Sequence, residues 1–236
     1  MFLVLGEKPS VAQALAEVLG AKKRADGYLE GEDCIVSWCL GHLAEYAAPE
    51  VYDERYKKWE FADLPILPKA WELRIAKDKK EQFDVLKELL NRKDLEYVVN
   101  ACDAGREGEL IFKRVYDLSK SSLPVKRLWI SSMEEQAICD GFSNLKNGKE
   151  YERLCEAAVC RAKADWLVGM NATRAFTTTY YKRIMKTARL TVVWKILFLF
   201  GKKQRSSFLH SLFSVIYQHQ KVTALLMYMM IFGKNW

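Results

Sequence analysis

The stretch LEYVVNACDAGREGEL, residues 95–110, decides how this chain folds. Its first half, residues 95–102, is a short apolar run of the kind that forms a buried parallel strand. From residue 107 to residue 118 apolar side chains recur at helical spacing, so a helix is predicted after the strand. Asp103 and Glu107 therefore lie at the carboxyl end of a strand, the edge where open α/β sheets bind ligands.

The amino terminus repeats this arrangement. Residues 1–5 are a second apolar run, and residues 11–19 follow it with a helical pattern. Ser10 is predicted to cap the start of this helix, and Gly20 to end it in the left-handed conformation. Glu7 thus occupies a second strand-to-helix corner.

These two corners predict a metal site if their strands are neighbours in one sheet. Glu7, Asp103 and Glu107 would then converge, and such oxygen ligands suit Mg²⁺, whose shell substrate phosphates complete. Lys8 would stand beside them as a phosphate contact. The alternative is that the acids after the second strand only form a solvated helix start, which the helix dipole favours.

The rest of the chain predicts an α/β fold with a mostly parallel sheet and flanking helices, followed by the helical start of a second domain. A long helix is expected to begin near residue 149. Further strands are expected at 34–40, 71–76 and 126–130, and further helices at 79–90 and 134–145.

The net charge of +7 is unevenly distributed along the 236 residues. Residues 1–165 hold 26 basic and all 30 acidic residues, a net charge of −4, whereas residues 166–236 hold 11 basic residues and no acidic one. The overall basicity therefore belongs to the last third, and it does not by itself indicate a DNA-binding surface.

Cysteine spacing and apolar run lengths bear on zinc and on membranes. The six cysteines form no C-x-x-C pair, so we expect no zinc site and reduced thiols in a cytoplasmic protein. The apolar stretches at 190–200 and 222–232 have 11 residues each, well short of the ~20 needed to cross a bilayer. No membrane partner is expected.

Four motifs follow one another as they do in type IA DNA topoisomerases, and the chain resembles the amino-terminal part of bacterial topoisomerase III. One such motif would be modest evidence, but four in the right order are specific. They are GEKPSVA at 6–12, GHL at 41–43, DAGREGE at 103–109 and RAKADWLVGMN at 161–171.

The resemblance implies a Toprim domain over residues 1–145 that holds Mg²⁺. The strand-end Glu and the D-x-D-x-E element of the family match Glu7, Asp103 and Glu107. Gly105 stands where the second Asp of that element usually lies, so one carboxylate is missing. Mg²⁺ binding should be weaker but retained, since Mg²⁺ keeps several waters and usually needs one or two protein carboxylates.

The family cleaves, passes and religates one DNA strand without ATP, through a bond between a Tyr and a phosphate. The resemblance makes Glu7 the general acid near the leaving 3′-oxygen and lets Lys8 offset phosphoryl charge. The nucleophile should lie in a Tyr-x-Arg-Thr type motif, which is absent here. We therefore expect that the polypeptide is the product of a truncation or a frameshift after about residue 185 and that it is inactive alone. Its acid-free tail at 186–236 need not be natively folded.

Single-stranded DNA is the partner that the resemblance implies. His42 is expected to meet a phosphate, and Arg161, Asp165 and Arg174 lie in residues 149–185, which would open the domain that lines the DNA groove. His42 could equally be a structural hydrogen-bonding residue. Arg161 and Asp165, four residues apart, could equally be a helix-surface ion pair worth about 0.3–0.5 kcal/mol.

Two other classes of function stay open at this stage. The first is a different Toprim enzyme, a primase or a metal-dependent nuclease, which the motif at residues 161–171 argues against. The second is a DNA-binding remnant without catalysis, which would bind single strands and not cut them.

Overall fold

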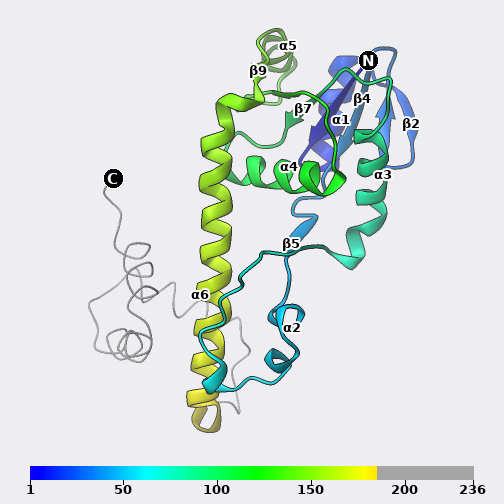
Figure 1. The fold of residues 1–236 in the computed structure, drawn as a ribbon. Coiled ribbons are helices and arrows are strands. Elements are labelled where there is room, and N and C mark those ends of the chain that lie inside the picture. The colour runs from blue at the N-terminus through cyan, green and yellow to red at the C-terminus, as the bar shows by residue number, and fades with distance from the viewer. Residues whose placement is uncertain (185–236) are drawn as a thin grey trace, which may run out of the picture. The chain divides into compact units, whose positions relative to one another are not determined.

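The computed structural model describes residues 1–184 (Figure 1). The predicted tail at 186–236 lies outside the described residues. By its contacts the chain divides into two compact units, one made of residues 1–52 and 68–165, the other of residues 53–67 and the chain from 166 onward. The first unit contains all the predicted strands.

A seven-stranded sheet forms the centre of the first unit, with the order β2-β3-β4-β1-β7-β8-β9. The inner strands β4, β1, β7 and β8 run parallel, and β2, β3 and β9 pair antiparallel at the two edges. The strands are β1 (Phe2–Gly6), β2 (Lys23–Ala25), β3 (Tyr28–Glu30), β4 (Cys34–Trp38), β7 (Tyr97–Ala101), β8 (Val125–Arg127) and β9 (Lys146–Asn147).

The mostly parallel sheet with flanking helices confirms the predicted fold class. The strand predicted at 71–76 exists, but it pairs in a separate two-stranded sheet of β5 (Ala44–Tyr46) and β6 (Leu73–Ile75). The helices are α1 (Pro9–Leu19), α2 (Pro49–Tyr52), α3 (Lys80–Leu90), α4 (Arg106–Ser119), α5 (Glu135–Ser143) and α6 (Glu152–Ile184), with short 3-10 turns η1 (Glu54–Lys57), η2 (Phe61–Asp63), η3 (Lys77–Lys79) and η4 (Gly148–Tyr151).

Both faces of the sheet are covered, as the alternation along β1 requires. Leu3 and Leu5 belong to one buried cluster, which side chains of α3 and α4 complete. Val4 points to the other face, into a cluster completed by Leu15 of α1 and Ile138 of α5. All five side chains are fully buried. The strands are apolar at consecutive positions because helices cover both faces of the sheet.

The start of α1 differs from the prediction. Lys8 occupies the cap position in an extended conformation, without a side-chain hydrogen bond, and Pro9 is the first helical residue. Pro suits that position because its φ is already helical and its missing N–H would have no partner there. Ser10 therefore lies inside the helix, whereas Gly20 ends it in the left-handed conformation as predicted, with φ +75°.

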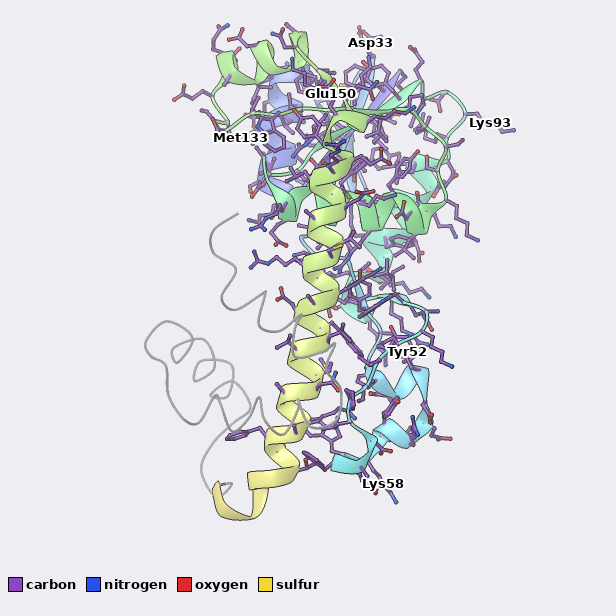
Figure 2. The ribbon with its side chains drawn as sticks, turned by 60° about the vertical axis from the view of Figure 1, so that its left-hand side comes forward. Asp33, Tyr52, Lys58, Lys93, Met133 and Glu150 are labelled. Atoms are coloured by element: carbon purple, nitrogen blue, oxygen red, sulfur yellow. The ribbon has the colours of Figure 1, made fainter. Side chains whose placement is uncertain are left out.

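The long helix α6 begins close to the predicted place. Asn147 and Glu150 form a capping box around the short turn η4, and α6 follows directly at Glu152. Glu150 lies in the turn that leads into the helix (Figure 2). The box satisfies amide groups that would otherwise be unpaired at a helix start.

Side chains of α6 hold the loop of the second unit. The amide of Asn171 accepts a hydrogen bond from the Ile66 N–H at 2.6 Å and donates one to the Ile66 carbonyl at 3.0 Å. Arg174 donates to the Tyr56 carbonyl at 2.8 Å, and its guanidinium lies 5.0 Å from the centre of the Trp59 ring. These contacts tie residues 53–67 to the helix.

Candidate functional site

The two strand-to-helix corners lie side by side. In the parallel register Gly6 of β1 pairs with Ala101 of β7, so Glu7 and Asp103 leave the same edge of the sheet. Glu7 is buried, with 8% of its surface exposed, whereas Asp103 is exposed. The neighbourhood that the sequence predicted from two separate motifs is thus created by the pairing of β1 with β7.

His42 reaches the same edge from β4. Leu40 and Gly41 both have positive φ, +50° and +67°, which turns the chain sharply after the strand. Gly41 N–H then donates to the Glu7 carbonyl at 2.9 Å. The His42 Nε2 atom lies 3.6 Å from Glu107 Oε2, and its buried Nδ1 atom has no hydrogen-bond partner among the described residues.

The donor types at this edge fit Mg²⁺. Glu7, Asp103 and Glu107 are carboxylates, the hard oxygen ligands that Mg²⁺ takes, and Lys8 Nζ lies 3.5 Å from Glu7 Oε1. Within residues 1–184, however, no three His, Cys, Asp or Glu side chains form a group that could hold a metal ion. Glu107 lies against His42, so the three-carboxylate site stays a prediction.

Two glycines shape the loop after β7. A Cβ atom at Gly108 would collide with the backbone carbonyl of Asp103 and approach its nitrogen to 2.9 Å, so only glycine lets α4 pack against this loop. Gly105 has an extended backbone, and no atom lies within 4 Å of the place that a Cβ atom would take there. The side chain of an Asp at 105 would therefore fit.

Sequence reasoning missed a buried polar network behind this loop. Arg127, at the end of β8, is 1% exposed and donates through Nε to Glu109 Oε1 at 2.6 Å. Its two Nη atoms donate to the carbonyls of Asn100, Cys102 and Asp103 at 2.9, 2.7 and 2.7 Å. The available signal was Arg127, which stands beside Lys126 in the strand predicted at 126–130, since a charge that a strand buries needs a partner.

Glu109 completes the network from the first turn of α4. Its Oε2 atom accepts a hydrogen bond from the Asn100 amide at 3.3 Å, and Asn100 in turn accepts one from the Cys102 N–H at 3.1 Å. Burial raises the pKa of Glu109, and the charge of Arg127 opposes that shift. The carboxyl and the guanidinium are thus held together with less than a tenth of either side chain exposed.

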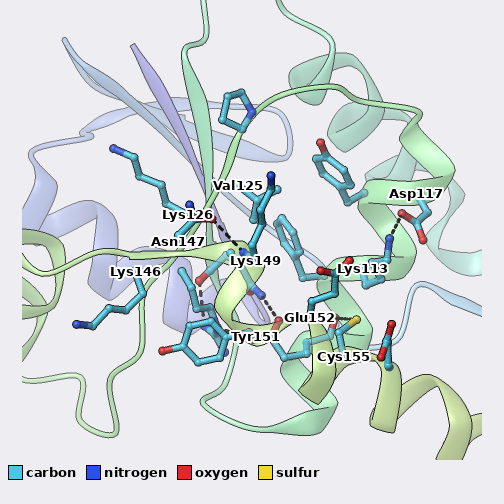
Figure 3. Close-up of a pocket in the computed structure, with 18 of the residues that line it drawn as sticks. Lys113, Asp117, Val125, Lys126, Lys146, Asn147, Lys149, Tyr151, Glu152 and Cys155 are labelled. Carbon is cyan, nitrogen blue, oxygen red and sulfur yellow. Dashed lines mark hydrogen bonds and ion pairs between the residues drawn. The ribbon is translucent and has the colours of Figure 1, made fainter.

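A cavity of about 1140 Å³ lies beside this network, between α4, β8, β9 and the first turns of α6 (Figure 3). Asn100, Glu109 and Arg127 are among the residues that line it. Lys113 Nζ lies 2.6 Å from Asp117 Oδ1 on its wall, a contact drawn in the close-up (Figure 3). The buried pair therefore borders a cavity on this side.

Two buried cysteines near the site, Cys102 and Cys155, have raised pKa values. All six cysteines are free. A hydrogen bond with the Cys39 thiol, together with burial, raises the pKa of Cys102 well above its usual value. Burial raises the pKa of Cys155 to about 11. Because the thiolate is the reactive form, these groups are inert at neutral pH.

A comparison with known families identifies the domain that contains this edge of the sheet. The family model of the Toprim domain matches residues 2–133. This chain belongs to the Toprim domain family. The matched residues contain Glu7, His42, Asp103 and Glu107.

The Toprim chain is also similar to curated proteins beyond the domain itself. DNA topoisomerase 3 of Bacillus cereus is 51% identical over 178 residues, which are 75% of this chain and 24% of that protein. DNA topoisomerase 3 of Bacillus licheniformis is 52% identical over 178 residues, again 75% and 24%. The chain thus spans about a quarter of the length of the curated relatives it matches.

One solved structure, that of full-length topoisomerase I from Thermotoga maritima, matches with a TM-score of 0.46 at 20% identity. The match covers 71% of this chain and 24% of that one. Within the described part of the Toprim chain, no helix is long and apolar enough to cross a membrane.

The predicted DNA-side residues of the Toprim chain have different surroundings. Arg161 Nε lies 3.6 Å from Asp165 Oδ2, and both side chains are about half exposed. The pair therefore fits a helix-surface ion pair and equally leaves Arg161 open to a phosphate. Arg174 is 5% exposed, so it would reach DNA only if residues 53–67 moved away from it.

Proposed function

We propose that this chain is the amino-terminal part of a type IA DNA topoisomerase of the topoisomerase III kind, which binds Mg²⁺ and single-stranded DNA. The observation that carries the proposal is the parallel pairing of β1 with β7, which puts Glu7 and Asp103 on one edge. The identity of about half of the residues to DNA topoisomerase 3 proteins supports it.

The roles of the residues follow from their chemistry. Glu7, Asp103 and Glu107 would hold Mg²⁺, which when bound would neutralise phosphate charge and orient the strand. Glu7 is buried at the edge of the sheet, and its carboxyl would serve as the general acid that protonates a leaving 3′-oxygen. Lys8, 59% exposed at its side chain, would offset charge on the phosphate.

The covalent step needs a tyrosine that this chain lacks in a recognisable motif. The 236 residues therefore supply the metal and proton-transfer half of the reaction, and we propose that alone they bind a strand without cleaving it. His42 and Arg161 would add contacts to the strand from the solvent side. Arg174 would do so after a rearrangement of its loop.

Mg²⁺ binding is tested by melting the chain with and without millimolar MgCl₂. A ligand that binds only the native state raises Tm, so wild type should gain stability. The Asp103→Ala/Glu107→Ala double variant should lose that gain. Asp84→Ala, which removes an exposed acid on α3, is the matched control and should keep it. Wild type that ignores Mg²⁺, or a double variant that still responds, contradicts the proposal.

Strand binding is tested by anisotropy of a labelled single-stranded oligonucleotide at several salt concentrations. Each phosphate contact contributes about −0.7 to the slope of log affinity against log salt. Lys8→Ala and Arg161→Ala should each flatten the slope, and Lys87→Ala, an exposed change on α3, should not. Equal slopes in all three variants would count against a strand bound at this edge.

A further inference from the structure

The guanidinium of Arg127 does more than pair with Glu109. One acceptor would neutralise its charge, yet it makes five hydrogen bonds: one to Glu109, three to carbonyls of residues 100, 102 and 103, and one to the Leu128 carbonyl at 2.6 Å. Three of the five thus go to the end of β7 and the segment that leaves it.

Among the described residues, β8 does not extend along this segment. The β7–β8 register ends with Asn100 opposite Arg127, so the carbonyls of Cys102 and Asp103 lie beyond the last paired residues. Backbone carbonyls beyond the end of a strand pairing would ordinarily bind water or belong to a mobile segment. The planar guanidinium of Arg127 binds these carbonyls, as the N–H groups of a longer strand would. It thereby fixes the course of the backbone that leads to Asp103.

The same loop is held from its other side by α4. The Asp103 carbonyl accepts from Arg127 Nη2, and Gly108 packs so closely against it that a Cβ would collide. Glu109, which binds Arg127, is the residue after Gly108 and two residues after Glu107. The network therefore links the backbone of Asp103 to the helical turn that carries Glu107.

We infer that Arg127 and Glu109 are positioning residues that hold Asp103 and Glu107 in a fixed relation for Mg²⁺, an inference that rests on the proposed function. Neither side chain is among the proposed Mg²⁺ ligands. They act through the Asp103 carbonyl and the first turn of α4. Residues that orient metal ligands in this way typically change metal affinity about 10- to 100-fold when replaced.

The decisive substitution keeps the positive charge at residue 127 and removes the planar guanidinium. Arg127→Lys can still pair with Glu109, but an ammonium offers no planar set of donors for three carbonyls. We expect Mg²⁺ affinity, measured by calorimetric titration and by Mn²⁺ electron paramagnetic resonance, to fall about 10-fold. Lys126→Arg is the matched control, because it keeps its charge on the same strand and lies over the Tyr97 ring, away from the loop. It should leave the affinity unchanged.

A second variant covers the case in which Arg127→Lys does not fold. Glu109→Gln keeps the size of the side chain, but its amide would meet the Asn100 amide, donor against donor, and release Asn100 from the network. A loss of Mg²⁺ affinity of the same sign is expected. Circular dichroism without metal checks that each variant is folded.

The outcomes separate the inference from the proposed function. Wild type without Mg²⁺ affinity overturns both. Wild type that binds Mg²⁺, with folded Arg127→Lys or Glu109→Gln binding it equally well, overturns only the positioning role. Weaker binding in the folded variants, with Lys126→Arg unchanged, supports it.

Discussion

Replacing Arg127 with Met tests the buried ion pair through stability and its dependence on pH. The change removes a guanidinium that is 1% exposed and leaves Glu109, 7% exposed, without its cation. Breaking a buried pair from one side typically costs about 3–5 kcal/mol, because the remaining charge is neither solvated nor paired. Against a typical stability of about 5–15 kcal/mol, such a loss is easily measured.

The pH dependence of that loss identifies its cause. Burial already raises the pKa of Glu109 while Arg127 opposes the rise, so removing Arg127 should raise this pKa further. When the pKa of a carboxyl is higher in the folded state than in the unfolded state, the contribution of that carboxyl to the free energy of unfolding is fully present below the unfolded-state pKa. This contribution is lost as the pH rises through the folded-state pKa. Relative to wild type, the variant should therefore lose less stability at pH 5 than at pH 8. Each further unit by which the pKa of Glu109 rises should add about 1.4 kcal/mol to the loss at the higher pH.

Urea denaturation followed by tryptophan fluorescence, at pH 5 and at pH 8, measures both quantities. Arg24→Met removes an exposed Arg from β2 and serves as the control, with an expected change within about 0.5 kcal/mol. A loss below about 1 kcal/mol at pH 8 would refute the account of Arg127, and an equal loss at both pH values would refute the part given to Glu109.

Three further outcomes are expected. Gly105→Asp should tighten Mg²⁺ binding in calorimetric titration, since the position has room and an extended backbone; unchanged affinity would place residue 105 outside the site. Leu15→Ala should lower the unfolding free energy by about 2–5 kcal/mol in urea, because Leu15 is fully buried in the core; a loss below about 1 kcal/mol would argue against that packing. Purified residues 1–236 should not relax negatively supercoiled DNA on agarose gels, and relaxation that vanishes in Glu7→Gln would contradict this.

Much of the fold follows from local pattern. The apolar runs at 1–5 and 95–102 become β1 and β7, and the helical spacing after residue 106 becomes α4, because burial on both faces of a sheet demands continuous apolar strands. The edge strands β2, β3 and β9 were not predicted. Segments of two or three residues carry too little alternation to be distinguished from turns.

Sequence by itself determined which chemistry is present: acids and a lysine at two strand-to-helix corners, and four motifs of one family in order. Tertiary structure alone decided which groups meet. It placed β1 between β4 and β7, so that His42 lies against Glu107 and Glu7 shares an edge with Asp103. It also brought Arg127 to carbonyls 24 to 27 residues away. The physical reason is that periodicity reports how each segment is buried, whereas strand order and register, which no local pattern encodes, set the contacts between segments.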